Sequence, residues 1–327
     1  MLGLSLAACV FVPSGKKMIS SAETVLGQKK LSDDIVSSAL RINENVNVEI
    51  FNLPKVYMLP MDLSPAPRPD PSKFTEDSYE DQSISVKCWH ERITFTNQKP
   101  VDANFADIRI AHPSQLRTAF AGGVYGYVKR SYTSKMAELN NAVIAVNADY
   151  YNYRSDGLLI RQGTLYRERP FDIDTLFIDS NGDLKVMRDY EAVNSQYYKK
   201  NEILQTIVFG PLLVENGKAL EKLNIVNVVD CGATGLNPRT AIGQLGPLHY
   251  LLCTIDGRSK QSAGVTVKGL AKIMEDKNCV IAYNLDGGQS TTMVFNGRLY
   301  NQVSGEGERA MSDCLYFASA VPESEWN

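Results

Sequence analysis

The feature that most constrains this chain is an apolar run that occurs twice and ends each time in the same polar pair. Residues 143 to 149 read VIAVNAD, and residues 280 to 286 read VIAYNLD. Short runs rich in valine, isoleucine and alanine are typical of buried strands. Turn chemistry explains the two glycines after the second run, but it does not explain why Asn-x-Asp follows both. The sequence therefore predicts two related buried strands.

The similarity continues on both sides of the two runs. KMAELNN precedes the first and GLAKIMEDKN precedes the second, and both predict helices that end in asparagine. After the runs, GLLIRQGTLY and TTMVFNGRLY predict hairpins with tight turns at Gln162-Gly163 and Asn296-Gly297. We therefore expect an α+β fold, in which a mixed β-sheet core is flanked by helices and contains an internal pseudo-repeat.

Strand alternation gives the two runs a chemical meaning. Successive side chains of a strand point to opposite faces, so Asn147 shares a face with Asp149, and Asn284 shares one with Asp286. Each buried strand would then present an amide and a carboxylate together at its end. If the two strands are neighbours, two carboxylates converge on one cleft.

The composition excludes several classes of protein. The chain has 327 residues and a net charge of -3, with no long basic run, which argues against nucleic acid as a partner. It contains three histidines and no Cys-x-x-Cys, so we expect no metal site and no cofactor. Carboxylates, arginines, amides and hydroxyls must then carry the chemistry.

The chain divides into three parts. Residues 1–50 resemble an anchor or signal-like segment followed by a polar spacer, and Leu6-Ala7-Ala8-Cys9 is similar to a lipoprotein cleavage site. A truncated membrane anchor or a mis-chosen start codon is an equal alternative, and both interpretations place the remaining chain outside the cytoplasmic membrane, either anchored or secreted. Residues 51–82 contain six prolines and predict an extended linker. The folded domain is expected over residues 83–320.

Six motifs, taken in order, strongly resemble the phosphodiester glycosidase family. They are VNADYYNYRSDGLLIRQGTLYR, FGPLLVENG, NPRTAIGQ, HYLLCTIDGRS, YNLDGGQSTTMVFNG and ERAMSDCLYF. The family includes a lysosomal enzyme that removes N-acetylglucosamine from its phosphodiester on mannose, and many bacterial envelope proteins. This chain differs by having Ala148 and Gln289 at positions where glycine is common, and the second change bears on substrate fit.

The resemblance implies a sugar joined through its anomeric carbon to a phosphodiester. The departing phosphate has a pKa of about 6, so the site needs cationic stabilisation more than a strong general acid. Arginine suits that task through its bidentate geometry. The expected substrate-binding residues are Asn147, Arg161, Arg239, Arg258, Asn284, Gly287, Gly288, Ser290, Thr291 and Arg309.

Asp286 is the first candidate for nucleophile or general base, because Gly287 and Gly288 would let backbone amides approach the substrate. Asp149 is the expected second carboxylate, and Asp256 and Glu306 are reserves. A turn-capping aspartate or a structural ion pair is the alternative for each charged residue. Two other functions remain open: a phosphodiesterase that breaks P–O, and a non-catalytic polysaccharide-binding envelope protein.

Overall fold

The computed structural model describes residues 57–96, 99–126, 130–149, 151–169, 172–187, 202–225 and 235–326. The expected anchor and spacer over residues 1–50 lie outside the described residues, as do Cys9 and Cys231. The described part of the proline-rich segment contains the short 3-10 helix Pro71–Lys73 and the strand Ser78–Glu80, and the side chains of Leu59, Ala66 and Tyr79 are buried.

The largest element is an eight-stranded sheet in which every neighbouring pair is antiparallel. In spatial order its strands are β1 (Ser78–Glu80), β2 (Ile84–Ile93), β3 (Val101–Ile110), β14 (His249–Ile255), β13 (Arg239–Gly246), β15 (Ile281–Leu285), β11 (Leu212–Glu215) and β12 (Lys218–Ala219).

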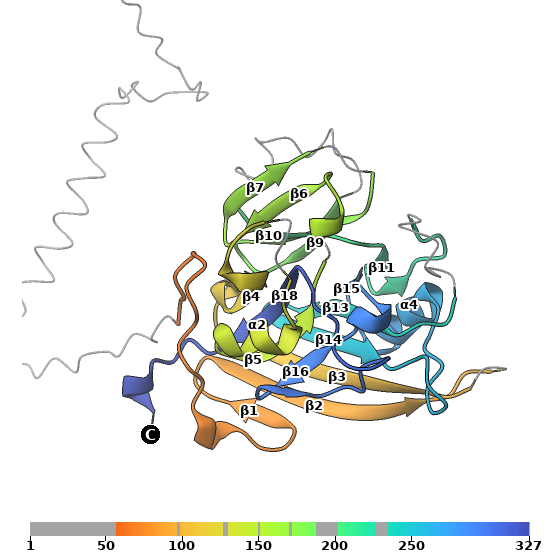
Figure 1. Ribbon diagram of the computed structural model, residues 1–327, viewed down its shortest axis with the longest axis horizontal. Coiled ribbons are helices and arrows are strands. Elements are labelled where there is room, and N and C mark those ends of the chain that lie inside the picture. Colours follow the sequence, from red (N-terminus) through yellow and green to blue (C-terminus); the bar gives the residue numbers. More distant parts are fainter. Residues whose placement is uncertain are drawn as a thin grey trace, which may run out of the picture. The chain divides into compact units, whose positions relative to one another are not determined.

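A five-stranded antiparallel sheet packs on one face of the larger sheet (Figure 1). Its strands are β17 (Arg298–Leu299), β16 (Met293–Phe295), β5 (Ala142–Asn147), β18 (Asp313–Ala318) and β4 (Leu116–Phe120). The main core lies between the two sheets, where side chains such as Val146, Leu252, Tyr283 and Leu315 are buried. The apolar runs are therefore covered from both sides, which explains why β5 and β15 are hydrophobic nearly throughout.

Helix α4 (Val267–Asp276) covers the outer face of the eight-stranded sheet. Its buried residues Leu270, Ala271 and Met274 recur at helical spacing, and the Thr266 hydroxyl accepts a hydrogen bond from the Gly269 N–H at the first turn. Helix α2 (Thr133–Leu139) covers the five-stranded sheet in the same way.

Two smaller sheets lie at the top of Figure 1. One contains β10 (Ile203–Val208), β8 (Thr175–Asp179) and β9 (Leu184–Met187), and the other contains β6 (Leu158–Arg161) and β7 (Thr164–Glu168). The predicted turns at Gln162-Gly163 and Asn296-Gly297 are confirmed, since all four residues have positive φ between antiparallel strands.

The predicted α+β fold with a mixed sheet is wrong. Within the described residues all strand pairs are antiparallel, and only α2 and α4 are α-helices. The expected order of helix, strand, Asn-x-Asp, strand, turn and strand is present in both segments. However, β5 and β15 belong to different sheets. Strand β5 pairs with β16 and β18, whereas β15 pairs with β13 and β11.

Candidate functional site

The ends of β5 and β15 meet although the strands lie in different sheets. The Asp286 N–H donates to the Ala148 carbonyl at 3.1 Å, and Asn147 Nδ2 donates to the Asp286 carbonyl at 2.6 Å. The other side of the Asn147 amide, Oδ1, accepts from the Thr240 hydroxyl and the Thr292 N–H. Asn147 is fully buried, so this expected substrate-binding residue instead fixes the backbone of Asp286.

The Asp286 side chain is half-buried at the mouth of this junction. Burial raises the pKa of its carboxyl to about 6, and the charge of Asp149 adds to that rise. The Ser290 hydroxyl, the Gly287 N–H at 2.8 Å and the Arg309 charge lower the pKa and oppose the effect of burial. Asp286 therefore changes charge close to neutral pH, as a general base or an acid-base group requires.

Glycines 287 and 288 are required by close packing against two arginine-bearing segments. A Cβ at Gly287 would lie 2.8 Å from the Pro238 carbonyl oxygen, and a Cβ at Gly288 would lie 3.0 Å from Arg258 Nη2. Gly288 also has a φ of 66°, which disfavours any other residue. The absence of two side chains therefore brings Arg258 and the segment before Arg239 against the backbone that follows Asp286.

Arg239 and Arg258 place two positive charges at this loop. Burial, and then the charge of Arg258, lower the pKa of Arg239 to about 10. Arg239 is anchored by its Nε–H, which donates to the Val265 carbonyl at 3.0 Å. Arg258 is exposed and has a φ of 56°, a backbone strain that often marks functional sites. Two neighbouring guanidinium groups favour the binding of an anion between them.

Arg309 completes the cationic surroundings from the loop before β18. It is exposed, its charge acts on Asp286, and its guanidinium lies 5.8 Å from the centre of the Tyr153 ring. Arg239, Arg258 and Arg309 thus come from three separate segments of the sequence. Of the arginines expected from the sequence, these three border the loop of Asp286.

Asp149 and Arg161 belong to a buried ion cluster that holds strands together. Both side chains are fully buried, and Asp149 accepts hydrogen bonds from the Tyr151 and Val208 N–H groups. Arg161 Nη2 lies 3.4 Å from Asp149 Oδ2 and 2.5 Å from Asp313 Oδ2. Burial, and then the charge of Asp149, hold the pKa of Asp313 well above its usual value. The expected second carboxylate therefore faces protein groups rather than a cleft.

The remaining polar residues of the Asp286 loop lie mostly inside the protein. Asn284, Ser290 and Thr291 are buried, and Asn284 Nδ2 donates to the Gly210 carbonyl at 2.7 Å. Within the described ranges, Asn284 Oδ1 and the Thr291 hydroxyl make no hydrogen bond. A buried polar atom without a partner is costly, and both atoms belong to the segment that carries Asp286.

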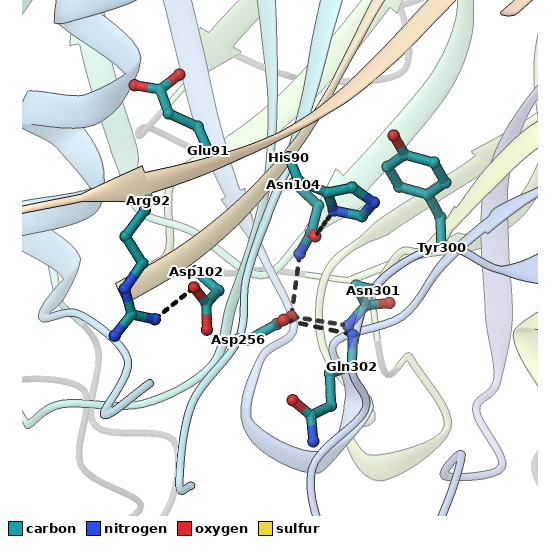
Figure 2. Close-up of a pocket in the computed structure, with 9 residues that line it drawn as sticks. All are labelled: His90, Glu91, Arg92, Asp102, Asn104, Asp256, Tyr300, Asn301 and Gln302. Carbon is teal, nitrogen blue, oxygen red and sulfur yellow. Dashed lines mark hydrogen bonds and ion pairs between the residues drawn. The ribbon is translucent and has the colours of Figure 1, made fainter. Parts of the chain in front are cut away.

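The two reserve carboxylates have different surroundings. Glu306 is exposed on the loop between β17 and β18. Asp256 follows β14 and lines a separate pocket, where burial raises the pKa of its carboxyl to about 6 (Figure 2). In the part of the chain that the structure describes, no three His, Cys, Asp or Glu side chains gather as metal ligands. None of the described helices is long and apolar enough to span a membrane.

A family model described as phosphodiester glycosidase matches residues 140–318. The chain belongs to the phosphodiester glycosidase family. This confirms the resemblance, and the matched interval includes Asp286 and the three arginines around it. Strands β2 and β3 lie before the interval.

Two individual proteins are similar to this phosphodiester glycosidase chain. The SPbeta prophage-derived uncharacterized protein YomE of Bacillus subtilis (strain 168) is 29% identical over 198 residues, which cover 58% of this chain but only 30% of that relative. The zebrafish N-acetylglucosamine-1-phosphodiester alpha-N-acetylglucosaminidase catalytic domain, solved auto-inhibited by its pro-peptide, superposes with a TM-score of 0.61 at 20% identity, covering 78% of this chain and 87% of that one. The second similarity establishes the fold.

Proposed function

We propose that this protein hydrolyses the bond between the anomeric carbon and the oxygen of a sugar-1-phosphodiester. One observation carries the proposal. The half-buried carboxylate of Asp286 has a pKa raised to about 6, and the cationic side chains of Arg239, Arg258 and Arg309 border its loop. A carboxylate that ionises near neutrality acts on the sugar carbon, while arginines bind the phosphate that leaves.

In the proposed reaction, ionised Asp286 either removes a proton from an attacking water or attacks the anomeric carbon itself. A new bond forms at that carbon, the carbon–oxygen bond breaks, and its electron pair remains on the departing phosphate oxygen. The phosphate accepts this charge without a proton because its second pKa is about 6. The arginines stabilise the charge as it develops. In the covalent variant, water then hydrolyses the glycosyl-aspartate.

The finer features of the substrate are part of the same proposal. We take the sugar to be of the N-acetylglucosamine-1-phosphate type, which is supported by the family and by the name of the zebrafish relative. We take the substrate to be an envelope or extracellular polysaccharide, and the protein to be extracytoplasmic and either secreted or attached to the membrane through its N-terminus. The signal-like first residues of the sequence support this location.

The leaving-group argument is tested by removing an arginine and changing the substrate. Arg258→Ala should slow hydrolysis of a sugar phosphodiester about 10²-fold or more, as expected for the loss of a group that stabilises developing charge. It should affect hydrolysis of an aryl glycoside of the same sugar much less, because that leaving group carries no phosphate. Arg258→Lys should restore activity only in part, since ammonium lacks the guanidinium fork.

The matched control is Arg298→Ala, which removes an exposed arginine on the edge strand β17. It should leave both rates close to those of the unaltered protein. Equal losses on both substrates in Arg258→Ala would contradict the assignment, because they would mean that Arg258 holds the sugar or the fold.

A further inference from the structure

The face of the eight-stranded sheet that forms the core changes character along its strands. Near one end the inward side chains are apolar, and near the other end they are polar, on three adjacent strands. The apolar inward residues are Val86 and Cys88 on β2, Ile108 and Ala106 on β3, and Tyr250 and Leu252 on β14. The next inward residue on each strand is polar: His90 on β2, Asn104 on β3 and Thr254 on β14, which Asp256 follows. The apolar core therefore ends in a polar floor.

This polar floor is open to a ligand. Residues 300–302, which follow β17, form the opposite wall of a pocket of about 530 Å³ (Figure 2). That volume lies within the usual range of small-molecule sites, about 300–1,000 Å³. Asn104 is 2% exposed and Asp256 is 6% exposed, so the floor contains nearly buried polar side chains, whereas His90 is exposed at its edge. Such groups are costly to place at the end of a core unless they serve a purpose.

A chain of hydrogen bonds fixes the direction of each polar group. Asn104 Nδ2 donates to Asp256 Oδ1 at 3.0 Å, so Asn104 Oδ1 is the atom that faces His90 Nδ1, at 2.7 Å. Because an amide oxygen only accepts, His90 Nδ1 carries a proton, and in the neutral imidazole His90 Nε2 is then an acceptor. Asp256 Oδ2 is also an acceptor, and among the described residues the bond it receives is a 3.4 Å one from the Gln302 N–H.

We propose that this pocket binds a neutral, polyhydroxylated sugar ring, as a second saccharide unit of the substrate away from the bond on which Asp286 acts. The inference rests on the proposed function, which supplies a saccharide substrate. Two acceptors, His90 Nε2 and Asp256 Oδ2, match ligand hydroxyls, which donate hydrogen bonds. Asp102 is paired with Arg92, which also lines the pocket, so the carboxylate of Asp256 is the group that disfavours a phosphate in the same place.

The walls suit the apolar side of a sugar ring. The rings of His90 and Tyr300 stack with centroids 4.4 Å apart and planes 5° apart, and the Tyr300 hydroxyl is held by Asp77 at 2.8 Å. The two rings cover each other's facing sides, so their outer faces and edges are the contact area available to a sugar, with little loss of side-chain entropy. Asn301 joins the pocket to the candidate site, since its Nδ2 donates to the Thr291 carbonyl at 3.2 Å and lies 3.5 Å from Asp256 Oδ1.

The test is NMR of the imidazole signals, because the chain has only three histidines. The full-length protein is titrated separately with methyl glycosides of glucose, mannose and N-acetylglucosamine, and with inorganic phosphate. We expect at least one methyl glycoside to shift the His90 signal saturably. The signals of His112 and His249 should stay unchanged, since His249 lies at the other end of β14 and bonds to Asp107. The variant His90→Phe assigns the signal.

Asp256→Asn should weaken sugar binding about tenfold or more, the usual effect of losing a hydrogen bond to a charged group. Its matched control is Asp107→Asn, which makes the same change beside His249 and should leave the affinity unaltered. The proposal is overturned if no methyl glycoside shifts the His90 signal, or if phosphate shifts it and the sugars do not. Binding is measured by NMR in the absence of turnover, so it is independent of hydrolysis. Hydrolysis without sugar binding would contradict the proposed sugar site but not the proposed reaction. Sugar binding without hydrolysis would contradict the proposed reaction alone.

Discussion

At the scale of single residues, Asp286 is held in a state that costs folding free energy. The carboxyl of an unfolded chain has a pKa of 3.8, and burial raises that of Asp286 to about 6. The folded state therefore holds its proton more tightly, so stability is lost as pH rises between these two values and stays lower above pH 6. A shift of about 2 units corresponds to at most about 3 kcal/mol.

This cost predicts opposite effects of Asp286→Asn on activity and stability. Turnover should fall by about 10²–10⁴-fold or more, because the amide cannot act as a base or nucleophile. At pH 8 the midpoint of thermal unfolding should rise by about 2–4 °C for each kcal/mol recovered, since the ionised group is gone. At pH 4, where most of the native carboxyl is already protonated, the difference should largely disappear. A variant that is less stable at pH 8 would mean that the ionised carboxylate stabilises the fold.

The sequence indicated which residues gather near Asp286 but not which of them are accessible. Arg239, Arg258 and Arg309 were expected, and they border the loop. Asp149 was expected to share a cleft with Asp286, but its oxygens are engaged by backbone N–H groups and by Arg161. Its partner Asp313 lies 164 positions away, so no local pattern could show that a buried cluster would form.

At the scale of secondary-structure elements, that buried cluster joins strands of separate sheets. Arg161 ends β6, Asp313 begins β18, and the Thr206 carbonyl of β10 accepts from Arg161 Nη1. Replacing Arg161 leaves two buried carboxylates without their cation, so Arg161→Met should cost about 3–5 kcal/mol of unfolding free energy in urea titrations. Arg298→Met, the same change at an exposed position on β17, should stay within about 0.5 kcal/mol. Equal stability of the two variants would show that the cluster is dispensable.

Helix ends, which depend on local sequence, could be predicted, whereas the pairing of strands could not. The helices do end near asparagine, and Asn141 and Asn278 have φ values of 56° and 63°, which glycine or asparagine adopts most readily. The alternation of helix and strand suggested a mixed sheet. The observed sheets instead pair β5 with β16 and β18, and β15 with β13 and β11. Such pairing depends on contacts distant in sequence, which periodicity does not encode.

At the scale of the whole molecule, the two sheets enclose an apolar core that opens into a polar pocket beside the candidate site. No motif contains His90 or Asn104, so the pocket was not predicted from the sequence. A signal was nevertheless present: in ISVKCWHER, inward positions pass from Ile84, Val86 and Cys88 to His90. A strand whose buried face becomes polar before it ends indicates a site at that end.

The central claim is that the carbon–oxygen bond breaks and the phosphorus–oxygen bond survives. The most direct measurement is hydrolysis of a sugar-1-phosphodiester in ¹⁸O-labelled water, with the released phosphate monoester analysed by mass spectrometry. The phosphate is the better product to examine, because the anomeric hydroxyl of a free sugar exchanges with water. The Asp286→Asn protein, prepared in parallel, should release no product above background, which rules out a contaminating phosphatase. Cleavage of the carbon–oxygen bond predicts a phosphate product that contains no solvent oxygen. Labelled phosphate would contradict it and would identify the protein as a phosphodiesterase.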